Sequence, residues 1–345
     1  NHKTTIINSV GEWNILKKEI SKKKISLTHQ NYKLKFTNID GYLKSRLAFL
    51  IIFIKSYAYL KKILLSEKPD YLVIHLITSL PIILFLMNNF QTKLILRISG
   101  YPKLTFFRKL LWRLGNKNIK FVTVPTVDTR KTLNKKKIFN NKKIFYLPDP
   151  VLEENIIKKK DKIRLKNFIL NIGRLTKQKN QELLIRSFYY ISRKYKNIKL
   201  VILGKGEKYH DLIKITKDLN LLDKVIFEGH VKNVNEYINS SLCVVVSSLW
   251  EDPGFVMIES SNLKKTVISS DCPNGPKEFF KNGKNGFVFK NNNQNSLIKT
   301  FSNFMNSSNE DINRKIKINY INSKQYSIKN HSILFNKLLK RHETI

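Results

Sequence analysis

Short apolar runs alternate along the chain with longer stretches in which apolar residues recur every three or four positions. The short runs predict buried strands, and the longer stretches predict amphipathic helices. Their alternation predicts α/β layers with parallel sheets. The expected strands are 4–8, 71–75, 93–97, 120–124, 168–172, 200–203, 225–228, 243–247, 266–270 and 286–289. The expected helices of the second half are 181–195, 207–219, 255–263 and 295–305.

A break in the alternation separates two halves of the chain. Pro148, Pro150 and the charged run 158–166 interrupt the periodicity, which predicts a linker. Two doubly wound domains that face each other across a cleft are the expected architecture. The expected parts are a first domain over 1–150, a second over 151–308, and helices over 309–345 that pack back across the domain boundary.

Two apolar stretches bear on membrane contact. The uncharged stretch 71–92 is long enough to span a bilayer, but His75 and Pro81 favour a strand, a loop and a helix. The stretch 42–65 has an apolar centre flanked by lysines. It predicts either a helix that lies on an anionic bilayer or a core helix with solvated lysines, and both interpretations stay open.

The charge of the chain is strongly basic and uneven. Lys and Arg number 64 against 25 Asp and Glu, a net charge of +39, of which residues 1–150 carry +22. This excess implies an anionic partner: a membrane surface, a nucleic acid or a phosphorylated substrate. Apolar residues make up 42% of the chain, which excludes disorder as a global description. Cys243 and Cys272 cannot make a disulfide framework, which predicts a reducing, cytoplasmic compartment.

The loops after the strands carry the first candidate residues, because ligands of such sheets bind at the carboxyl ends of strands. Arg174 and Lys179 follow the strand 168–172 and can both reach one diphosphate. Gly204 and Gly206 follow the next strand in a turn whose amides can face a nucleotide. This turn is neither a GxGxxG sequence nor a Walker loop, which disfavours dinucleotide and P-loop sites.

The strongest local pattern begins after the strand 243–247. Asp252 can cap a helix with Pro253 at its first position, so that the start of the helix offers free amides to a phosphate. The residues that offer these amides are Gly254, Phe255 and Val256.

Two carboxylates bracket this anion site. Glu251 lies just ahead of the helix and Glu259 about two turns into it, so that one can accept from sugar hydroxyls and the other from a ribose. Spacing alone also allows a capping aspartate with two solvated glutamates. The loop 270–278 adds another acid near the same strand ends.

The order of these motifs resembles that of the retaining family 4 glycosyltransferases, which have the GT-B fold of two Rossmann-like domains. The match covers residues 168–290 through Gly-Arg-Leu-x3-Lys, Gly-x-Gly-Glu, Glu-x7-Glu and Gly-Pro-Lys-Glu-x4-Gly-x2-Gly-Phe-Val. The first half matches more loosely, through 68–75 and 97–100. The family opens with a further strand, glycine-rich loop and helix, and residues 1–7 resemble its second strand. A unit of roughly 30 residues, the size of a strand plus a helix, is therefore expected to be missing.

The resemblance implies roles for single residues. Arg174 and Lys179 would hold the donor diphosphate, Glu251 would contact the transferred sugar, and Glu259 would bind the nucleotide ribose. His75, at the end of a strand of the first half, would lie beside the sugar near the reacting centre. The implied catalytic residues are Glu251, His75, Arg174 and Lys179, and the implied donor-binding residues are Arg174, Lys179, Gly204, Gly206, Gly254, Phe255, Val256 and Glu259.

The implied reaction is transfer of a hexose, with retention, from a nucleoside diphosphate sugar to a lipid-linked or membrane-proximal glycan in polysaccharide or lipopolysaccharide assembly. A UDP-sugar is the expected donor. The resemblance implies neither metal ion nor cofactor, which agrees with the lack of an Asp-x-Asp motif. The basic first half and the stretch 42–65 predict peripheral attachment to the cytoplasmic face of the cell membrane.

Three alternatives stay open. A nucleic-acid-binding protein would use the charge of +39, but Arg is scarce and no recognition-helix module is present, so we expect no nucleic-acid partner. A sugar-nucleotide epimerase of the same fold would isomerise the free nucleotide sugar without an acceptor. A non-catalytic relative kept for assembly agrees with the missing N-terminal unit.

Overall fold

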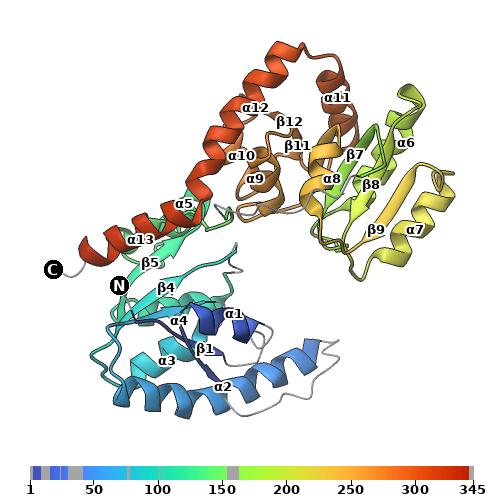
Figure 1. Cartoon of the computed structure of the whole chain (residues 1–345). Helices are drawn as coiled ribbons and strands as arrows, with labels where there is room; N and C mark the ends of the chain where they lie inside the picture. The colour runs from blue at the N-terminus through green and yellow to red at the C-terminus, as the bar shows by residue number, and fades with distance from the viewer. Residues whose placement is uncertain are drawn as a thin grey trace. The chain divides into compact units, whose positions relative to one another are not determined.

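The computed structural model describes residues 3–8, 16–23, 25–29, 42–75, 78–100, 102, 104–153 and 163–341 (Figure 1). The chain divides into two compact units, and each is described by itself. The first unit comprises Asn1–Arg97, Leu104–Val122 and Ile138–Lys143. The second comprises Ile98–Lys103, Thr123–Lys137 and Ile144–Ile345.

Residues before 150 form two sheets. In one, β1 (Thr5–Asn8) pairs in parallel with β2 (Ser26–His29), and α1 (Lys17–Lys22) separates them along the chain. The other has the order β3-β4-β5-β6. Its strands are β3 (Tyr71–Ile74), β4 (Lys93–Arg97), β5 (Ile119–Val124) and β6 (Ile144–Tyr146), and the helices of this region are α2 (Tyr42–Ser66), α3 (Ser79–Met87), α4 (Phe106–Gly115) and α5 (Val127–Lys135).

The second unit is built on a parallel sheet of six strands in the order β12-β11-β10-β7-β8-β9. Its central strands are runs of β-branched and other apolar residues, which suit a sheet covered on both faces. The strands are β7 (Phe168–Ile172), β8 (Lys199–Leu203), β9 (Val225–Gly229), β10 (Cys243–Val246), β11 (Val267–Ser270) and β12 (Phe287–Phe289).

Helices cover both faces of this sheet, which makes the second unit doubly wound. These helices are α6 (Gln181–Lys194), α7 (Tyr209–Asp218) and α11 (Gln294–Met305) on one face, and α8 (Val234–Ser240), α9 (Phe255–Asn262) and α10 (Pro276–Phe279) on the other. One apolar core joins the sheet to the three helices α6, α7 and α11, through side chains such as Phe188, Leu212 and Phe301. The other core joins the opposite face of the sheet to the three helices α8, α9 and α10, through side chains such as Ile238 and Met257.

Two further helices end the described chain, α12 (Asn309–Ser323) and α13 (Ile328–Arg341), drawn in red in Figure 1. The Ser308 hydroxyl caps α12 by accepting from the Asp311 amide. Between the helices, the carbonyl of Tyr326 accepts hydrogen bonds from the amides of Val151 and Leu152. The end of the chain is therefore tied to the segment that leads into β7.

The expected α/β class with parallel sheets is confirmed, and the expected strands appear within one or two residues of their predicted bounds. The strands β2 and β6 and the helices α1, α4, α5, α8 and α10 had no prediction. The stretch 71–92 is a strand, a connection and the helix α3, as expected. The domain boundary at 150 stays a prediction.

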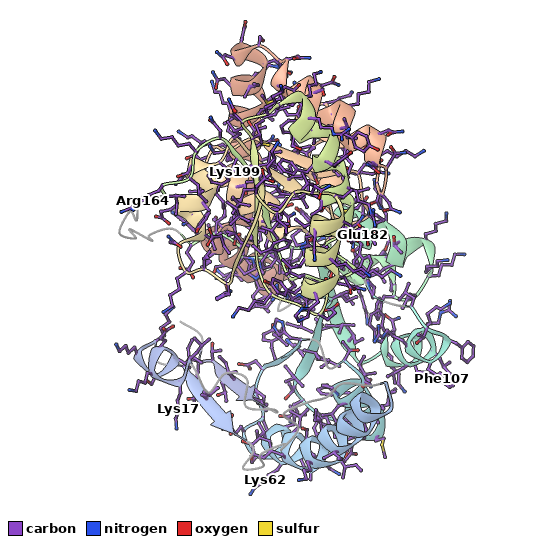
Figure 2. The ribbon with its side chains drawn as sticks, turned by 90° about the vertical axis from the view of Figure 1, so that its right-hand side faces the viewer. Lys17, Lys62, Phe107, Arg164, Glu182 and Lys199 are labelled. Atoms are coloured by element: carbon purple, nitrogen blue, oxygen red, sulfur yellow. The ribbon has the colours of Figure 1, made fainter. Side chains whose placement is uncertain are left out.

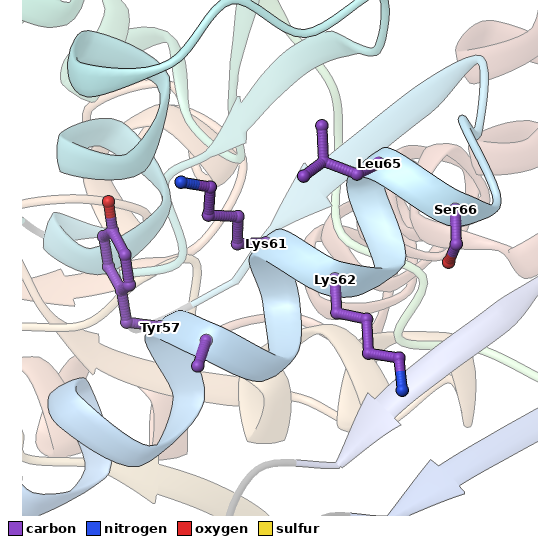
Figure 3. A pocket seen from close by; sticks show the side chains of 6 residues that line it. Tyr57, Lys61, Lys62, Leu65 and Ser66 are labelled. Atoms are coloured by element: carbon purple, nitrogen blue, oxygen red, sulfur yellow. The ribbon is translucent and has the colours of Figure 1, made fainter.

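The helix α2 has a buried side, as the core-helix interpretation of 42–65 predicts, whereas contact with a bilayer stays a prediction. Leu60, Ile63 and Leu64 are buried, as in a core helix, whereas Lys62 and Leu65 are exposed. A shallow cavity of about 540 Å³ lies along this outer side, between Tyr57 and Ser66 (Figure 3). None of the described helices is both long enough and apolar enough to cross a membrane.

Candidate active site

The candidate site lies at the carboxyl edge of the six-stranded sheet. The loops that leave β7, β8 and β10, together with the helix α9 that follows β10, carry all of the expected site residues except His75. Because parallel strands end at the same edge, these loops converge there. A cavity of about 370 Å³ opens between the ends of β7, β8 and β9, and it is lined by residues 172–174, 203–205, 229–231 and Val234.

Two glycine-containing loops pack closely beside this cavity. A Cβ atom on Gly204 would overlap the carbonyl oxygen of Gly173, and a Cβ atom on Gly206 would overlap that of Leu175. The amide of Gly204 donates to the Gly229 carbonyl at 2.7 Å, and the amide of Leu175 donates to the Lys205 carbonyl at 3.0 Å. The glycines therefore allow the close approach of two backbones, and the Gly204 amide is already bonded within the protein.

A lysine and a glutamate meet at this edge. Lys179 Nζ lies 2.6 Å from Glu251 Oε1, and the same oxygen accepts from the Ser248 hydroxyl at 2.6 Å. Only 7% of the Glu251 side chain and 18% of the Lys179 side chain are exposed. The stem of Lys179 also packs against the Gly173 backbone. Both charged groups are therefore held in fixed positions, and the second carboxylate oxygen of Glu251 remains available to a ligand.

The turn before α9 corrects one expectation. We predicted that Asp252 caps the helix with Pro253 at its first position, but Gly254 is the N-cap and the helix begins at Phe255. The Asp252–Pro253 peptide bond is cis, and the Pro253 carbonyl lies so close to Gly275 that a Cβ there would overlap it. Gly254 has φ +100°, a conformation that glycine adopts at little cost.

The start of α9 nevertheless offers backbone donors. The first bond within the helix runs from the Ile258 amide to the Gly254 carbonyl. The amides of Phe255, Val256 and Met257 precede it and have no acceptor within the helix, so they form the positive end of the helix dipole. Glu259 lies one turn after Phe255 on the same face, and burial raises the pKa of its carboxyl.

Asp252 lies in an acidic neighbourhood. Burial, and then the nearby charge of Asp149, raise the pKa of the Asp252 carboxyl to about 8. A hydrogen bond with the Asn274 side chain opposes this rise, and burial outweighs it. The protonated, neutral form therefore dominates at neutral pH.

Glu278 has a role that the sequence analysis did not find. Its Oε2 accepts hydrogen bonds from the amides of Val127 at 2.9 Å and Asp128 at 3.3 Å, at the start of α5. Beside it, Asn274 exchanges hydrogen bonds with the Thr129 hydroxyl. The helix α10 and the loop before it therefore hold the N-terminus of α5, and 151 positions separate Glu278 from Val127, so no local pattern signals this contact.

His75 belongs to the other compact unit. It follows β3 directly, is exposed, and its Nδ1 lies 3.4 Å from Arg97 Nη1. Arg174 is also exposed, at the mouth of the cavity in the second unit. The structure thus gathers the donor-side residues at one sheet edge, whereas the role of His75 stays a prediction. Among the described residues, no group of three or more His, Cys, Asp or Glu side chains could hold a metal ion.

Comparison with known proteins identifies the family of the second half of the chain. A family model described as "Glycosyl transferases group 1" matches residues 153–321. A Methanocaldococcus jannaschii protein named as an uncharacterized glycosyltransferase is 32% identical over 241 residues, which are 63% of this chain and 59% of the relative. The N-acetylgalactosamine-N,N'-diacetylbacillosaminyl-diphospho-undecaprenol 4-alpha-N-acetylgalactosaminyltransferase of Campylobacter jejuni is 30% identical over 218 residues, 60% of this chain and 59% of the relative. This chain matches about 59% of the length of each relative.

A solved structure extends the likeness to most of the chain. The crystal structure of Anabaena HepE in complex with UDP superposes with a TM-score of 0.72 over 95% of this chain and 89% of that protein. The identity is 13%, so this likeness concerns the fold alone. Residues 153–321 thus form a glycosyl transferases group 1 domain, which has glycosyltransferases as relatives and lies in a chain with the GT-B fold.

Proposed function

We propose that the chain is a retaining glycosyltransferase that binds a nucleoside diphosphate sugar at the carboxyl edge of the six-stranded sheet. The observation that carries the proposal is the convergence of the Lys179–Glu251 pair, the free amides of α9 and a cavity of about 370 Å³ within one unit. Cations and helix N-termini are suited to a diphosphate, and a cavity beside them is suited to a base and ribose.

Each group then has a part in holding the donor. The base occupies the cavity, and Glu259, which lies in α9 and does not line the cavity, accepts from the ribose hydroxyls. Arg174 and Lys179 bind the diphosphate, and Glu251 accepts from the hydroxyls of the transferred sugar through its second oxygen. Lys179 already bonds Glu251, so little rearrangement is needed when the donor arrives.

Catalysis then consists of positioning and charge stabilisation. When the bond between the sugar and the diphosphate breaks, negative charge grows on the departing phosphate. Arg174, Lys179 and the amides of Phe255 and Val256 stabilise that charge, while the sugar passes through an oxocarbenium-like state. The acceptor hydroxyl oxygen forms the new bond on the face that the diphosphate leaves, and its proton passes to the departing phosphate. These groups supply the positive charge from the protein itself, so the proposed reaction needs neither metal ion nor cofactor.

The proposed acceptor is a lipid-linked or membrane-proximal glycan, and the proposed location is the inner face of the cell membrane. The name of the Campylobacter relative, which specifies a diphospho-undecaprenol acceptor, supports this proposal. The net charge of +39 also suits an anionic membrane surface. A UDP-sugar is the proposed donor, which the UDP in the HepE structure supports.

Titration calorimetry with UDP, GDP, ADP and CMP tests the donor site. We expect saturable binding of one nucleoside diphosphate, weakened about tenfold or more by Arg174→Ala, because a charge-assisted hydrogen bond contributes about 1.5–3 kcal/mol. Glu259→Ala should weaken it as well. The matched controls are Arg186→Ala and Glu182→Ala, which remove an exposed ion pair on α6 and should leave affinity unchanged. A nucleotide affinity that is unchanged in both Arg174→Ala and Glu259→Ala would refute the proposed site.

A further inference from the structure

The helix α4 carries an exposed apolar stripe that neither the fold nor the donor site uses. Phe106 is 71% exposed, Phe107 80%, Leu110 46% and Leu114 55%. Figure 2 shows the Phe107 ring projecting away from the ribbon. At 3.6 residues per turn these four positions lie within about a third of the helix circumference, so they form one continuous stripe.

The stripe is separate from the face by which α4 is anchored. Trp112 is buried, packs at 5.4 Å against the Phe139 ring and donates from Nε1 to the Thr78 hydroxyl at 3.3 Å. Gly115 faces α3 so closely that a Cβ would press on Ile82. The core face of α4 is thus already complete, and its outer face is apolar where a surface helix normally carries polar side chains.

Basic residues flank the stripe. Lys109, Arg113 and Lys117 lie in or next to α4, whereas Arg108 lies over the Trp112 ring, and residues 104–120 contain no Asp or Glu. A helix with aromatic and Leu side chains on one stripe and cations beside it is suited to the boundary between the headgroups and acyl chains of an anionic bilayer. Such a stripe would not pair well with its own copy, because the cations of two copies would face each other.

We propose that α4 is a membrane-docking helix, which inserts Phe106, Phe107, Leu110 and Leu114 into an anionic lipid surface while its basic residues bind the headgroups. This inference rests on the membrane-proximal acceptor of the proposed function and assigns the contact to particular residues. It differs from the expectation for 42–65, because α2 directs Leu60, Ile63 and Leu64 into the core.

Vesicle flotation with the full chain tests the inference. We expect the wild type to float with vesicles of equimolar phosphatidylcholine and phosphatidylglycerol, and not to float with vesicles of phosphatidylcholine alone. Salt should release it from the anionic vesicles. Phe106→Ser with Phe107→Ser should weaken binding about tenfold or more, as expected when two apolar side chains no longer insert. The control pair is Tyr190→Ser with Leu222→Ser, which removes two exposed apolar side chains of the second unit.

Two further measurements keep the outcome clear. Thermal unfolding and nucleotide binding of the Phe variant should match the wild type, because the donor residues lie in the other unit. Flotation that is unchanged in the Phe variant, or equal with both vesicle types, would overturn the inference. A wild type that does not bind vesicles but dimerises through Phe107 would also overturn the inference. A wild type that floats but binds no nucleoside diphosphate would instead refute the donor site and leave α4 as the membrane contact.

Discussion

Replacing Glu278 by alanine is expected to loosen the start of α5. In the wild type, one carboxylate oxygen accepts from the amides of Val127 and Asp128, so it acts as a helix cap supplied from the distant helix α10. Truncation removes this acceptor and leaves two part-buried amides without it. Asn274 and Thr129 keep their own hydrogen bonds, so the helix should loosen at its first turn and remain folded beyond it.

The expected cost follows from the two hydrogen bonds. Removing a side-chain cap costs about 0.5–2 kcal/mol, and leaving buried donors unpaired adds to that cost. Burial raises the pKa of Glu278, which means that desolvation of its carboxylate opposes folding, and truncation relieves this part. We expect a net loss of about 1–2 kcal/mol, which would lower the Tm of a unit of this size by about 2–8 °C.

Hydrogen exchange and thermal unfolding measure this effect. The amides at the start of α5 should exchange faster in Glu278→Ala, whereas those of α6 should not change. Glu278→Gln keeps one acceptor oxygen and should lose about half as much stability. Glu182→Ala, on an exposed face of α6, is the matched control. Wild-type exchange at the start of α5 together with a wild-type Tm would refute the capping role.

Three further substitutions follow from the geometry. Between pH values near 4 and near 8 the folded chain retains the Asp252 proton that the unfolded chain releases, so the free energy of unfolding falls as pH rises through that window. Urea unfolding of Asp252→Asn should show a smaller fall, and an unchanged pH profile would contradict this prediction. Lys179→Met leaves the nearly buried Glu251 carboxylate without its cation and should cost about 2–3 kcal/mol in urea unfolding, whereas Lys205→Met should cost little. Gly204→Ala would press a methyl group on the Gly173 carbonyl, so we expect a clear loss of Tm and of nucleotide affinity; full retention of both would show that the two loops can separate.

The sequence predicted well what local pattern determines. The strands of the second unit are continuous apolar runs such as 243–246, and a buried parallel sheet requires such runs. The loops after these strands could be located from the strands alone, which is why Arg174, Lys179 and Glu251 lie at one sheet edge as expected; their roles stay predictions. The turns at Gly204 and Gly206 were found for the same reason, although the close approach of the neighbouring backbone was not foreseen.

The sequence failed where distant contacts decide the outcome. Asp252 and Pro253 look like a helix start, but the helix begins at Phe255, and the Pro253 carbonyl lies close to Gly275 of a loop that is distant in sequence. The cap that Glu278 provides to α5 joins residues 151 positions apart, so no spacing rule reveals it. The strand β6 was missed because its three residues precede Pro148 and its neighbours suggested a linker.

The measurement that tests the central claim most directly is hydrogen exchange of the full chain with and without a saturating nucleoside diphosphate. We expect slower exchange in the loops 173–179, 204–206 and 229–234 and at the start of α9, because these segments line the cavity and the anion site. The start of α4 should not change. Protection confined to residues outside the second unit, or no protection at saturating ligand, would contradict a donor site at the carboxyl edge of the six-stranded sheet.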